Sequence, residues 1–257
     1  MPGYLELCVN TWRHYLPEYE IAILDYESIT DWLPHDMVKR FSCKSAPLPM
    51  QADIYRALLI QRYGGIWFDC DTIITAAAAN TIRNLTGETA FIGSAEARWV
   101  HAAFIYAKHP HAHIIDEWVN ELRNRVPFLR LKHSSKLGRI IFKLMTYLKL
   151  TKHINWDYVF NSIVNTLVMN TDNGTAQVLD RWIFGVFPED TLPENSPNVR
   201  YEDFWFTAGE VDNIKQYVKS GIILLHNSWT PKQFKEMSSE EFLRQDIRLS
   251  RLLRTVI

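Results

Sequence analysis

The chain has 257 residues, of which 47% are hydrophobic, and this is enough to bury the core of one large domain. Its formal net charge of −1 gives no overall attraction to nucleic acid, and it contains no run of about 18 or more apolar residues that could span a bilayer. The cysteines Cys8, Cys43 and Cys70 are odd in number and have no paired spacing, which argues against a disulfide framework and favours a reducing cytoplasm.

The chain begins with a predicted helix and not with a strand. The helix is expected from Tyr4 to Tyr15, a strand from Glu20 to Leu24 and a short helical segment from Ser28 to Lys39. Because α/β proteins usually open on a strand, this order indicates that a first strand is missing from the front.

The stretch from Gln51 to Ile74 places carboxylates where a strand leaves the core. A helix that ends at Gly64 is followed by a buried strand from Ile66 to Phe68, and Asp69 and Asp71 come directly after the strand. Residues two apart can turn toward one cation where a strand breaks into a loop. The pattern therefore predicts a site for a hard metal ion and a phosphate-linked substrate.

Two charged residues stand on the helix before that strand. Asp53 and Arg56 are three positions apart and share one face of the helix. Taken alone, the pair is explained by a favourable charge near the helix start and an ordinary salt bridge.

The rest of the chain continues to alternate strands and helices. Strands are expected at Thr89–Gly93, His101–Ala107, Arg181–Phe187, Val199–Thr207 and Gly221–Leu225, and helices at His111–Asn124, Trp156–Met169 and from Pro231 to about Leu253. Pro127 is expected to interrupt helical structure. This alternation predicts an α/β fold with a mixed, mainly parallel sheet flanked by helices. The polar residues of Asp69–Asp71 and His226–Trp229 would then lie together at the carboxyl edge of the sheet.

Positive charge is concentrated in one segment. Residues 123–152 contain nine Lys or Arg and no acid, so the remainder of the chain carries a net charge of −10. Within residues 125–152, apolar residues recur at helical spacing between the cations, which predicts a basic amphipathic helical insertion. Such a helix either packs one face on the domain or, through residues 128–150, contacts an anionic membrane; no motif supports a nucleic-acid role.

The full spacing of the central stretch resembles a known enzyme family. D-x-x-R-x-L-L-x-x-x-x-G-G-x-aromatic-x-D-x-D is similar to the DxD-containing sugar transferases that include yeast-type initiating mannosyltransferases, clostridial glucosylating toxins and capsular polysaccharide synthesis proteins (glycosyltransferase family 32-like). The matching residues are Asp53, Arg56, Leu58, Leu59, Gly64, Gly65, Trp67, Asp69 and Asp71. The segments Asn10–Asp25 and His226–Trp229 resemble other parts of the same family.

The resemblance implies a single GT-A domain over residues 1–257, a nucleotide-sugar donor with UDP-sugar favoured, and Mn²⁺ or Mg²⁺ as cofactor. It implies that Asp53 and Arg56 contact the donor sugar and its phosphate and that Asp69 contacts the ribose or sugar. These residues are the expected catalytic group. Trp67, which stands where the family commonly has Tyr, would lie beneath the donor.

The resemblance also implies a metal and diphosphate site. Asp71 and His226, with Asp69 beside them, would hold the metal, while Ser228 and Trp229 would touch the diphosphate. The expected function is metal-dependent, retaining transfer of a hexose from the nucleotide-sugar to a saccharide or lipid-linked saccharide acceptor. The place would be surface or capsular polysaccharide synthesis, in the cytoplasm or at the inner face of the membrane.

Other interpretations remain open at this point. A haloacid-dehalogenase-like phosphohydrolase also has D-x-D after a strand, although Ile73 stands where that family has Thr or Val, and a non-catalytic glycan-binding protein could keep the fold. Residues that could act as a nucleophile in retaining transfer are Glu96, Asp116, Asp157 and Asn161. A zinc site at the alternating histidines of residues 109–113 is a weaker alternative to a solvated turn.

Overall fold

The protein is described by a computed structural model that covers residues 1–25, 27–96, 98–151, 154–155, 157–171, 175–186, 200–211 and 221–257. The chain divides into two compact units. Unit 1 comprises Met1–Ala22, Phe68–Leu85 and Leu179–Ile257, and unit 2 comprises Ile23–Trp67 and Thr86–Val178. The assignment of one domain to the whole chain stays a prediction.

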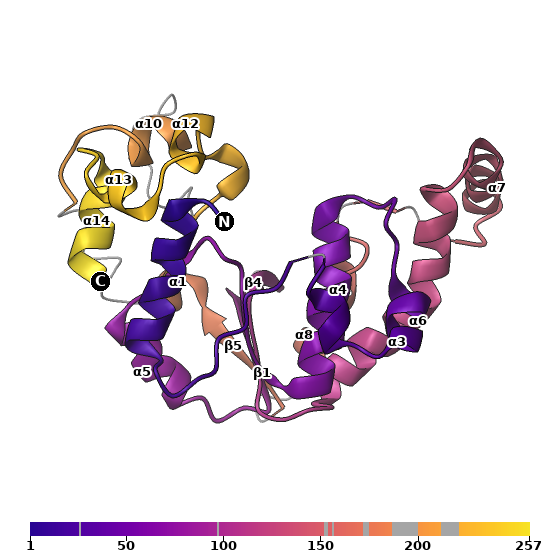
Figure 1. The fold of residues 1–257 in the computed structure, drawn as a ribbon. Helices are drawn as coiled ribbons and strands as arrows, with labels where there is room; N and C mark the ends of the chain where they lie inside the picture. Colours follow the sequence, from indigo (N-terminus) through magenta and orange to yellow (C-terminus); the bar gives the residue numbers. More distant parts are fainter. Residues whose placement is uncertain are drawn as a thin grey trace. The chain divides into compact units, whose positions relative to one another are not determined.

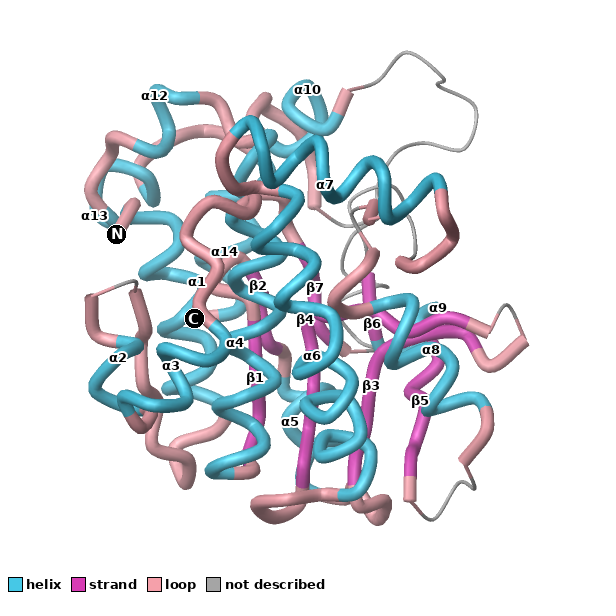
Figure 2. Tube along the Cα trace, turned by 90° about the vertical axis from the view of Figure 1, so that its right-hand side faces the viewer, coloured by secondary structure: helices cyan, strands magenta, loops and turns pink. Residues whose placement is uncertain are grey.

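Unit 2 contains a four-stranded sheet in the order β1-β4-β3-β5, with the four strands side by side in Figure 2. Strands β3 and β4 pair antiparallel, from Thr89 opposite Ala107 to Ser94 opposite Trp99. The helices α4, α6 and α8 lie on one face of this sheet (Figure 1). The elements are α2 (Ile29–Trp32), α3 (His35–Phe41), α4 (Leu48–Tyr63), β1 (Gly65–Phe68), β3 (Thr89–Ser94), β4 (Trp99–Ala107), α6 (His113–Lys132), α7 (Lys136–Tyr147), α8 (Asn161–Met169) and β5 (Ala176–Asp180). Strands β1 and β5 end just across the boundary with unit 1.

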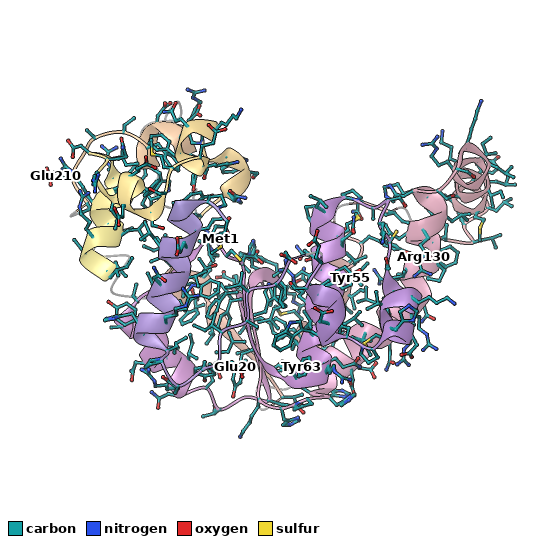
Figure 3. The ribbon with its side chains drawn as sticks, viewed as in Figure 1. Met1, Glu20, Tyr55, Tyr63, Arg130 and Glu210 are labelled. Carbon is teal, nitrogen blue, oxygen red and sulfur yellow. The ribbon has the colours of Figure 1, made fainter. Side chains whose placement is uncertain are left out.

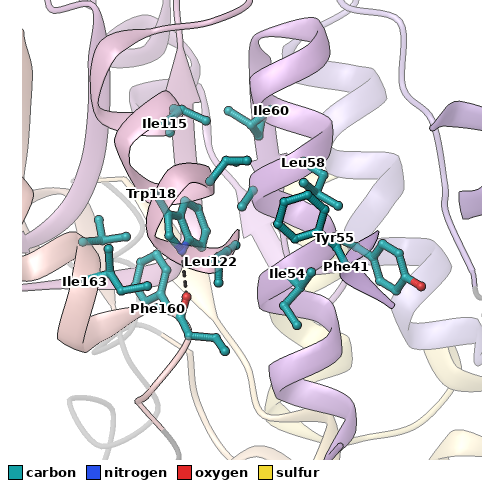
Figure 4. Close-up of a cluster of buried hydrophobic side chains, with 14 of the residues drawn as sticks. Phe41, Ile54, Tyr55, Leu58, Ile60, Ile115, Trp118, Leu122, Phe160 and Ile163 are labelled. Atoms are coloured by element: carbon teal, nitrogen blue, oxygen red, sulfur yellow. Dashed lines mark hydrogen bonds between the residues drawn. The ribbon is translucent and has the colours of Figure 1, made fainter. Parts of the chain in front are cut away.

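The core of unit 2 forms where α4, α6 and α8 turn their apolar faces toward one another (Figure 4). Trp118 on α6 is fully buried, its ring meets that of Phe160 at a centroid distance of 5.1 Å, and its Nε1 donates to the carbonyl of Val159 at 2.7 Å. A buried indole N–H needs such an acceptor, since an unmade hydrogen bond would cost about 1–3 kcal/mol. This contact fixes the chain entering α8, which also supplies one wall of the pocket described below.

Helix α6 is secured at its far end by Arg130. The guanidinium of Arg130, which Figure 3 labels, donates to the backbone carbonyls of Lys39 and Arg40 near the end of α3 and of the cap residue Ser42. Carbonyls at the end of a helix lack intrahelical partners, so an arginine there satisfies several at once.

Unit 1 contains a three-stranded sheet in the order β2-β7-β6. Strand β7 pairs antiparallel with β2 and parallel with β6. Helix α1 packs along β2, where the Trp12 Nε1 donates to the carbonyl of Thr72 at 2.7 Å and the buried Thr11 Oγ1 accepts from the Ile74 amide at 2.9 Å. The elements are α1 (Gly3–Tyr15), β2 (Thr72–Ile74), α5 (Ala76–Arg83), α9 (Arg181–Phe184), β6 (Gly185–Val186), α10 (Tyr201–Trp205), β7 (Ile222–Leu224), the 3-10 helix η2 (Asn227–Trp229), α12 (Lys232–Lys235), α13 (Ser239–Leu243) and α14 (Arg248–Val256).

The predicted fold class is confirmed: helices flank a mixed sheet that includes parallel pairing. Several local predictions are wrong. Residues 20–24 form no strand, Tyr201–Trp205 is a helix and not part of a strand, and α6 continues through Pro127 to Lys132. Arg181–Phe184 is helical, and a short strand follows at Gly185–Val186. Trp156, Phe187 and Val199 lie outside the described residues.

None of the helices in the described ranges is both long enough and apolar enough to cross a membrane.

Candidate functional site

Asp53 and Arg56 form a buried ion pair on α4 in unit 2. The Nε of Arg56 lies 3.4 Å from the Oδ1 of Asp53, and the two side chains are only 7% and 14% exposed. The guanidinium also donates to the carbonyl of Ala102 on β4 and lies over the ring of Trp67, 5.2 Å from its centroid. Contacts with Asp53 on α4, Ala102 on β4 and Trp67 on β1 therefore hold Arg56 in one position. Because Arg56 is fixed, the carboxylate of Asp53 that pairs with it is also well oriented.

Asp53 lines a pocket within unit 2. The cavity has a volume of about 590 Å³, within the range of sites that hold small ligands. Its lining residues come from the start of α4, from β4, from the end of α6 and from the segment leading into α8: Pro47, Pro49, Met50, Asp53, His101, Ala102, Lys132, His133, Asn155, Asp157, Phe160 and Asn161. The lining combines apolar residues with several hydrogen-bonding side chains, as is common in sites for small ligands.

Two polar atoms of the pocket lining are buried without a hydrogen-bond partner in the described part of the chain. They are the Nε2 of His133 and the Oδ1 of Asp157. Burial, with a smaller contribution from the positive charge of Lys132, lowers the pKa of His133, so its imidazole is neutral at pH 7. Lys132 itself donates to the carbonyl of Ile154 at 2.6 Å. Buried polar atoms are usually paired, so these two atoms, left over in one pocket, are available to a ligand.

Asp71 in unit 1 is joined to the segment that follows β7. Its carboxylate Oδ2 accepts from the backbone amide of Asn227 at 2.8 Å, and its own carbonyl accepts from Leu225 at 3.0 Å. The sequence predicted that Asp71 and His226 would meet at the carboxyl edge of a parallel sheet. They are brought together instead because β2 and β7 are antiparallel, so that the start of β2 lies beside the end of β7.

The segment after β7 forms an aromatic surface. The ring of His226 lies on that of Trp229 with a centroid distance of 4.0 Å, and Tyr201 meets Trp229 at 5.5 Å. Trp229 is 52% exposed and Ser228 is also exposed, so both side chains are accessible. The hydroxyls of two tyrosines, Tyr4 and Tyr201, form hydrogen bonds to this segment.

The Tyr4 hydroxyl donates to Asn227 Oδ1, and the Tyr201 hydroxyl accepts from the His226 amide at 3.0 Å. Burial raises the pKa of Tyr4 and of Tyr201 well above the usual tyrosine range, so both hydroxyls stay protonated. Cys70, between the two aspartates, has its pKa raised by burial and by Asp69 and Asp71, and stays a thiol.

The residues near Asp71 fit a metal that is shared with a substrate. Among the described residues no group of three His, Cys, Asp or Glu side chains could hold a cation by itself. The carboxylate of Asp71 lies against the backbone of the segment that carries His226, which places a carboxylate beside a segment that bears an imidazole. Mg²⁺ and similar cations at phosphate sites are commonly held by one or two carboxylates plus substrate phosphates and water, and this donor set matches that arrangement.

The structure thus groups the predicted residues in two sets. Asp53, Arg56 and Trp67 belong to unit 2, and Asp69, Asp71, His226, Ser228 and Trp229 belong to unit 1. Contacts join Asp53, Arg56 and Trp67 in unit 2, and in unit 1 they join Asp71 to the segment of His226 and the ring of His226 to that of Trp229. The roles of all these residues toward donor and metal stay predictions.

Of the four nucleophile candidates, two lie in the lining of the pocket and two do not. Asp157 and Asn161 line the pocket with Asp53. Asp116 instead accepts from Gln61 at 2.7 Å and contacts His111 at 3.0 Å, and Glu96 is exposed in a turn. Sequence reasoning did not single out His133, because it carries no motif and lies in the basic segment.

The histidines of residues 109–113 do not form a metal cluster within the described chain. His109 pairs with Glu88 at 3.3 Å, while His111 pairs with Asp116 at 3.0 Å. The ordinary interpretation of a solvated turn accounts for them.

Comparison with known proteins identifies one family. No curated protein and no solved structure gives a significant match. A family profile described as capsular polysaccharide synthesis protein matches residues 1–170, about two thirds of the chain, including Asp53, Asp71 and the pocket lining. The chain therefore belongs to the capsular polysaccharide synthesis family, whose role lies in polysaccharide biosynthesis.

Proposed function

We propose that the protein is a glycosyltransferase that transfers a hexose from a nucleotide-sugar, with UDP-sugar favoured, to a saccharide acceptor during capsular polysaccharide synthesis. The observation that carries the proposal is the pocket of unit 2, in which the motif residue Asp53 meets the buried polar atoms of His133 and Asp157. All three residues fall inside the segment that the family profile matches.

The pocket supports a sugar as the ligand. A hexose needs donors and acceptors on several sides and an apolar surface for its C–H face. Asp53 and Asp157 supply carboxylate acceptors, His133 supplies a neutral imidazole and Phe160 supplies a ring. The contact with Arg56 fixes Asp53 in place, which is what a positioning hydrogen bond to a sugar hydroxyl requires.

In unit 1, Asp71 and His226 would hold Mn²⁺ or Mg²⁺, with Asp69 beside them. A divalent cation there would neutralise charge on the diphosphate as it leaves. Ser228 and the exposed ring of Trp229 would contact the diphosphate.

The transfer needs no reagent other than the nucleotide-sugar donor and the acceptor. The bond between the anomeric carbon and the diphosphate oxygen breaks and its electron pair leaves with the diphosphate, while the acceptor hydroxyl oxygen bonds to the anomeric carbon. The proton of that hydroxyl passes to the leaving phosphate or to a base. Retention requires a front-face route or a double displacement through a carboxylate, for which Asp157 is the candidate in the pocket.

Hydrolysis of the donor tests the proposal. We expect the purified protein to release free sugar from at least one UDP- or GDP-sugar in the presence of Mn²⁺. The Asp71→Ala and Asp53→Asn variants should lose roughly 100-fold or more of this rate, as when one electrostatic contact to a developing charge is removed. His109→Ala, whose ring pairs with Glu88 outside both residue sets, is the matched control and should keep the wild-type rate.

Two results would count against the proposal. One is the absence of sugar release from any nucleotide-sugar together with no binding of UDP or GDP. The other is release that Asp71→Ala leaves unchanged. Release of inorganic phosphate from simple phosphomonoesters would instead favour the phosphohydrolase alternative.

A further inference from the structure

Helix α7 in unit 2 leaves most of its apolar side chains in solvent. Leu137, Ile140 and Leu144 are 66%, 55% and 56% exposed, and Ile141, Tyr147, Leu148 and Leu150 are exposed too. Isolated exposed leucines are normal on a protein surface, but a contiguous row on one short helix is not.

The helix is attached to unit 2 through a narrow face. Only Gly138 and Phe142 are buried, and α7 packs on α6. A Cβ on Gly138 would overlap the Oγ of Ser134, so the glycine is what lets the helix approach the end of α6 closely. Figure 1 shows α7 beyond α6, on the side of unit 2 away from α4.

Side chains around α7 fall into three sectors when each residue is turned by about 100° from the last. Gly138 and Phe142 lie in the packed sector. Leu137, Ile141, Leu144 and Leu148 centre on a second sector, which is solvent-exposed. Lys136, Arg139 and Lys143 form the third sector, directly beside the exposed apolar one.

The charge beside the apolar sector is of one sign only. Residues 123–152 contain no acid, and Lys136, Arg139, Lys143 and Lys149 are all exposed. None of these four residues has an acidic partner among the described residues. In unit 1, by contrast, Arg83, Arg200, Arg244 and Arg251 each form an ion pair with an acidic side chain. The surface therefore offers an apolar strip and unneutralised cations at the same time.

We infer that α7, with Leu148 and Leu150 after it, docks in the plane of an anionic lipid surface. Leucine and isoleucine side chains would enter the acyl boundary, and the lysines and arginine beside them would remain among the phosphate headgroups. A symmetric contact with a second copy would set these cations against one another, and nucleic acid would leave the apolar strip in water. An anionic membrane provides acyl chains for the apolar sector and phosphate headgroups for the basic sector. This inference is independent of which sugar the protein transfers.

Vesicle binding by the full-length protein tests the inference. We expect sedimentation with vesicles that contain phosphatidylglycerol and much weaker binding to pure phosphatidylcholine, with the bound fraction falling as salt is added. Arg139→Gln with Lys143→Gln should lower the partition coefficient roughly 10- to 30-fold, because two headgroup contacts are lost. Ile140→Ser with Leu144→Ser should lower it roughly 10-fold or more.

Matched controls separate α7 from general surface effects. Lys39→Gln with Lys44→Gln removes the same charge from another exposed part of unit 2, and Leu48→Ser removes a leucine that is 61% exposed. These controls should bind vesicles as the wild type does. All the changed side chains are exposed, so the thermal midpoints should also match that of the wild type.

Three outcomes would overturn the inference. They are equal binding to both vesicle types, α7 variants that bind like the controls, and absence of vesicle binding together with a dimer that Ile140→Ser with Leu144→Ser abolishes. The last outcome would assign the apolar strip to a second copy of the chain.

Discussion

Arg56 is 6% exposed, and its charge is compensated by the carboxylate of Asp53, a backbone carbonyl and the face of Trp67. Removing one member of a buried pair costs far more than removing an exposed one, because the remaining charge stays desolvated. The side chain therefore supports the fold of unit 2 as well as the orientation of Asp53.

Arg56→Leu is expected to lower the free energy of unfolding by about 3 kcal/mol. The matched control is Arg244→Leu, since Arg244 pairs with Glu240 at the same 3.4 Å separation but with both side chains more than 70% exposed. The control should cost less than about 1 kcal/mol. Urea unfolding of the two variants measures the difference, and equal midpoints would show that burial does not set the value of the Asp53–Arg56 pair.

For individual residues, the sequence predicted contacts between residues that are close in the chain. It missed most contacts between residues that are distant in the chain. The spacing of Asp53 and Arg56 predicted their pairing, because residues three apart on a helix are neighbours. Asp157 was among the predicted nucleophile candidates, but nothing in the sequence placed either Asp157 or His133 in the pocket of Asp53. Their position depends on how α6 and the start of α8 pack, which no local pattern encodes.

The turn between α4 and β1 depends on two consecutive glycines with different surroundings. Gly64 has φ 66° and ψ −150°, and a Cβ there would lie 2.7 Å from the backbone carbon of His109. Gly65 has φ 84°, and a Cβ would meet nothing within 4 Å. Both have positive φ, but only Gly64 is also required by close packing.

Gly64→Ala should therefore destabilise the protein by about 3 kcal/mol, which combines backbone strain with displacement of the backbone at His109. Gly65→Ala should cost only about 1–2 kcal/mol, from the positive φ alone. Chemical denaturation of both variants gives the comparison. A larger loss for Gly65→Ala would mean that the packing against residue 109 is not tight.

Among the elements, the strands β1, β3, β4 and β7 and the long helices were predictable, whereas β2 and β5 were not. The apolar spacing of α1, α4, α6 and α7 predicted these helices, and burial of Trp118, Leu122, Val126 and Leu129 carries α6 through Pro127 although proline disfavours a helix interior. Residues 20–24 have the composition of a strand but are mostly exposed and lie outside both sheets. A strand forms only where a neighbouring strand pairs with it, and composition does not reveal that partner.

Tyr201–Trp205 was misread for a related reason. Its aromatic residues favour a strand by composition, yet Tyr201 and Trp205 are four apart and both are buried, as on one face of a helix. The segment is too short for the two periods to be distinguished from sequence.

For the whole molecule, the proposed donor site makes stability depend on ligand. A ligand that binds only the folded chain adds about 2.7 kcal/mol when present at 100 times its dissociation constant, which corresponds to roughly 5–10 °C in a protein of this size. We expect UDP with Mn²⁺ to raise the thermal midpoint by this amount and Asp71→Ala to reduce the rise sharply. A rise of equal size in that variant would mean that Asp71 takes no part in binding the diphosphate and its metal.

The three-segment composition of unit 1 affects the order in which the chain can fold. Unit 2 is complete once residue 178 has left the ribosome, whereas α1 must wait for residues from the last third of the chain. Tyr4, for example, bonds to Asn227, and the buried Trp12 lies in a unit whose sheet is closed by β7. At about 5–20 residues per second, the apolar face of α1 stays uncovered for at least several seconds of synthesis. Helix α1 precedes the other elements of unit 1 in the chain and is thus packed only late, so its apolar face stays exposed on the nascent chain.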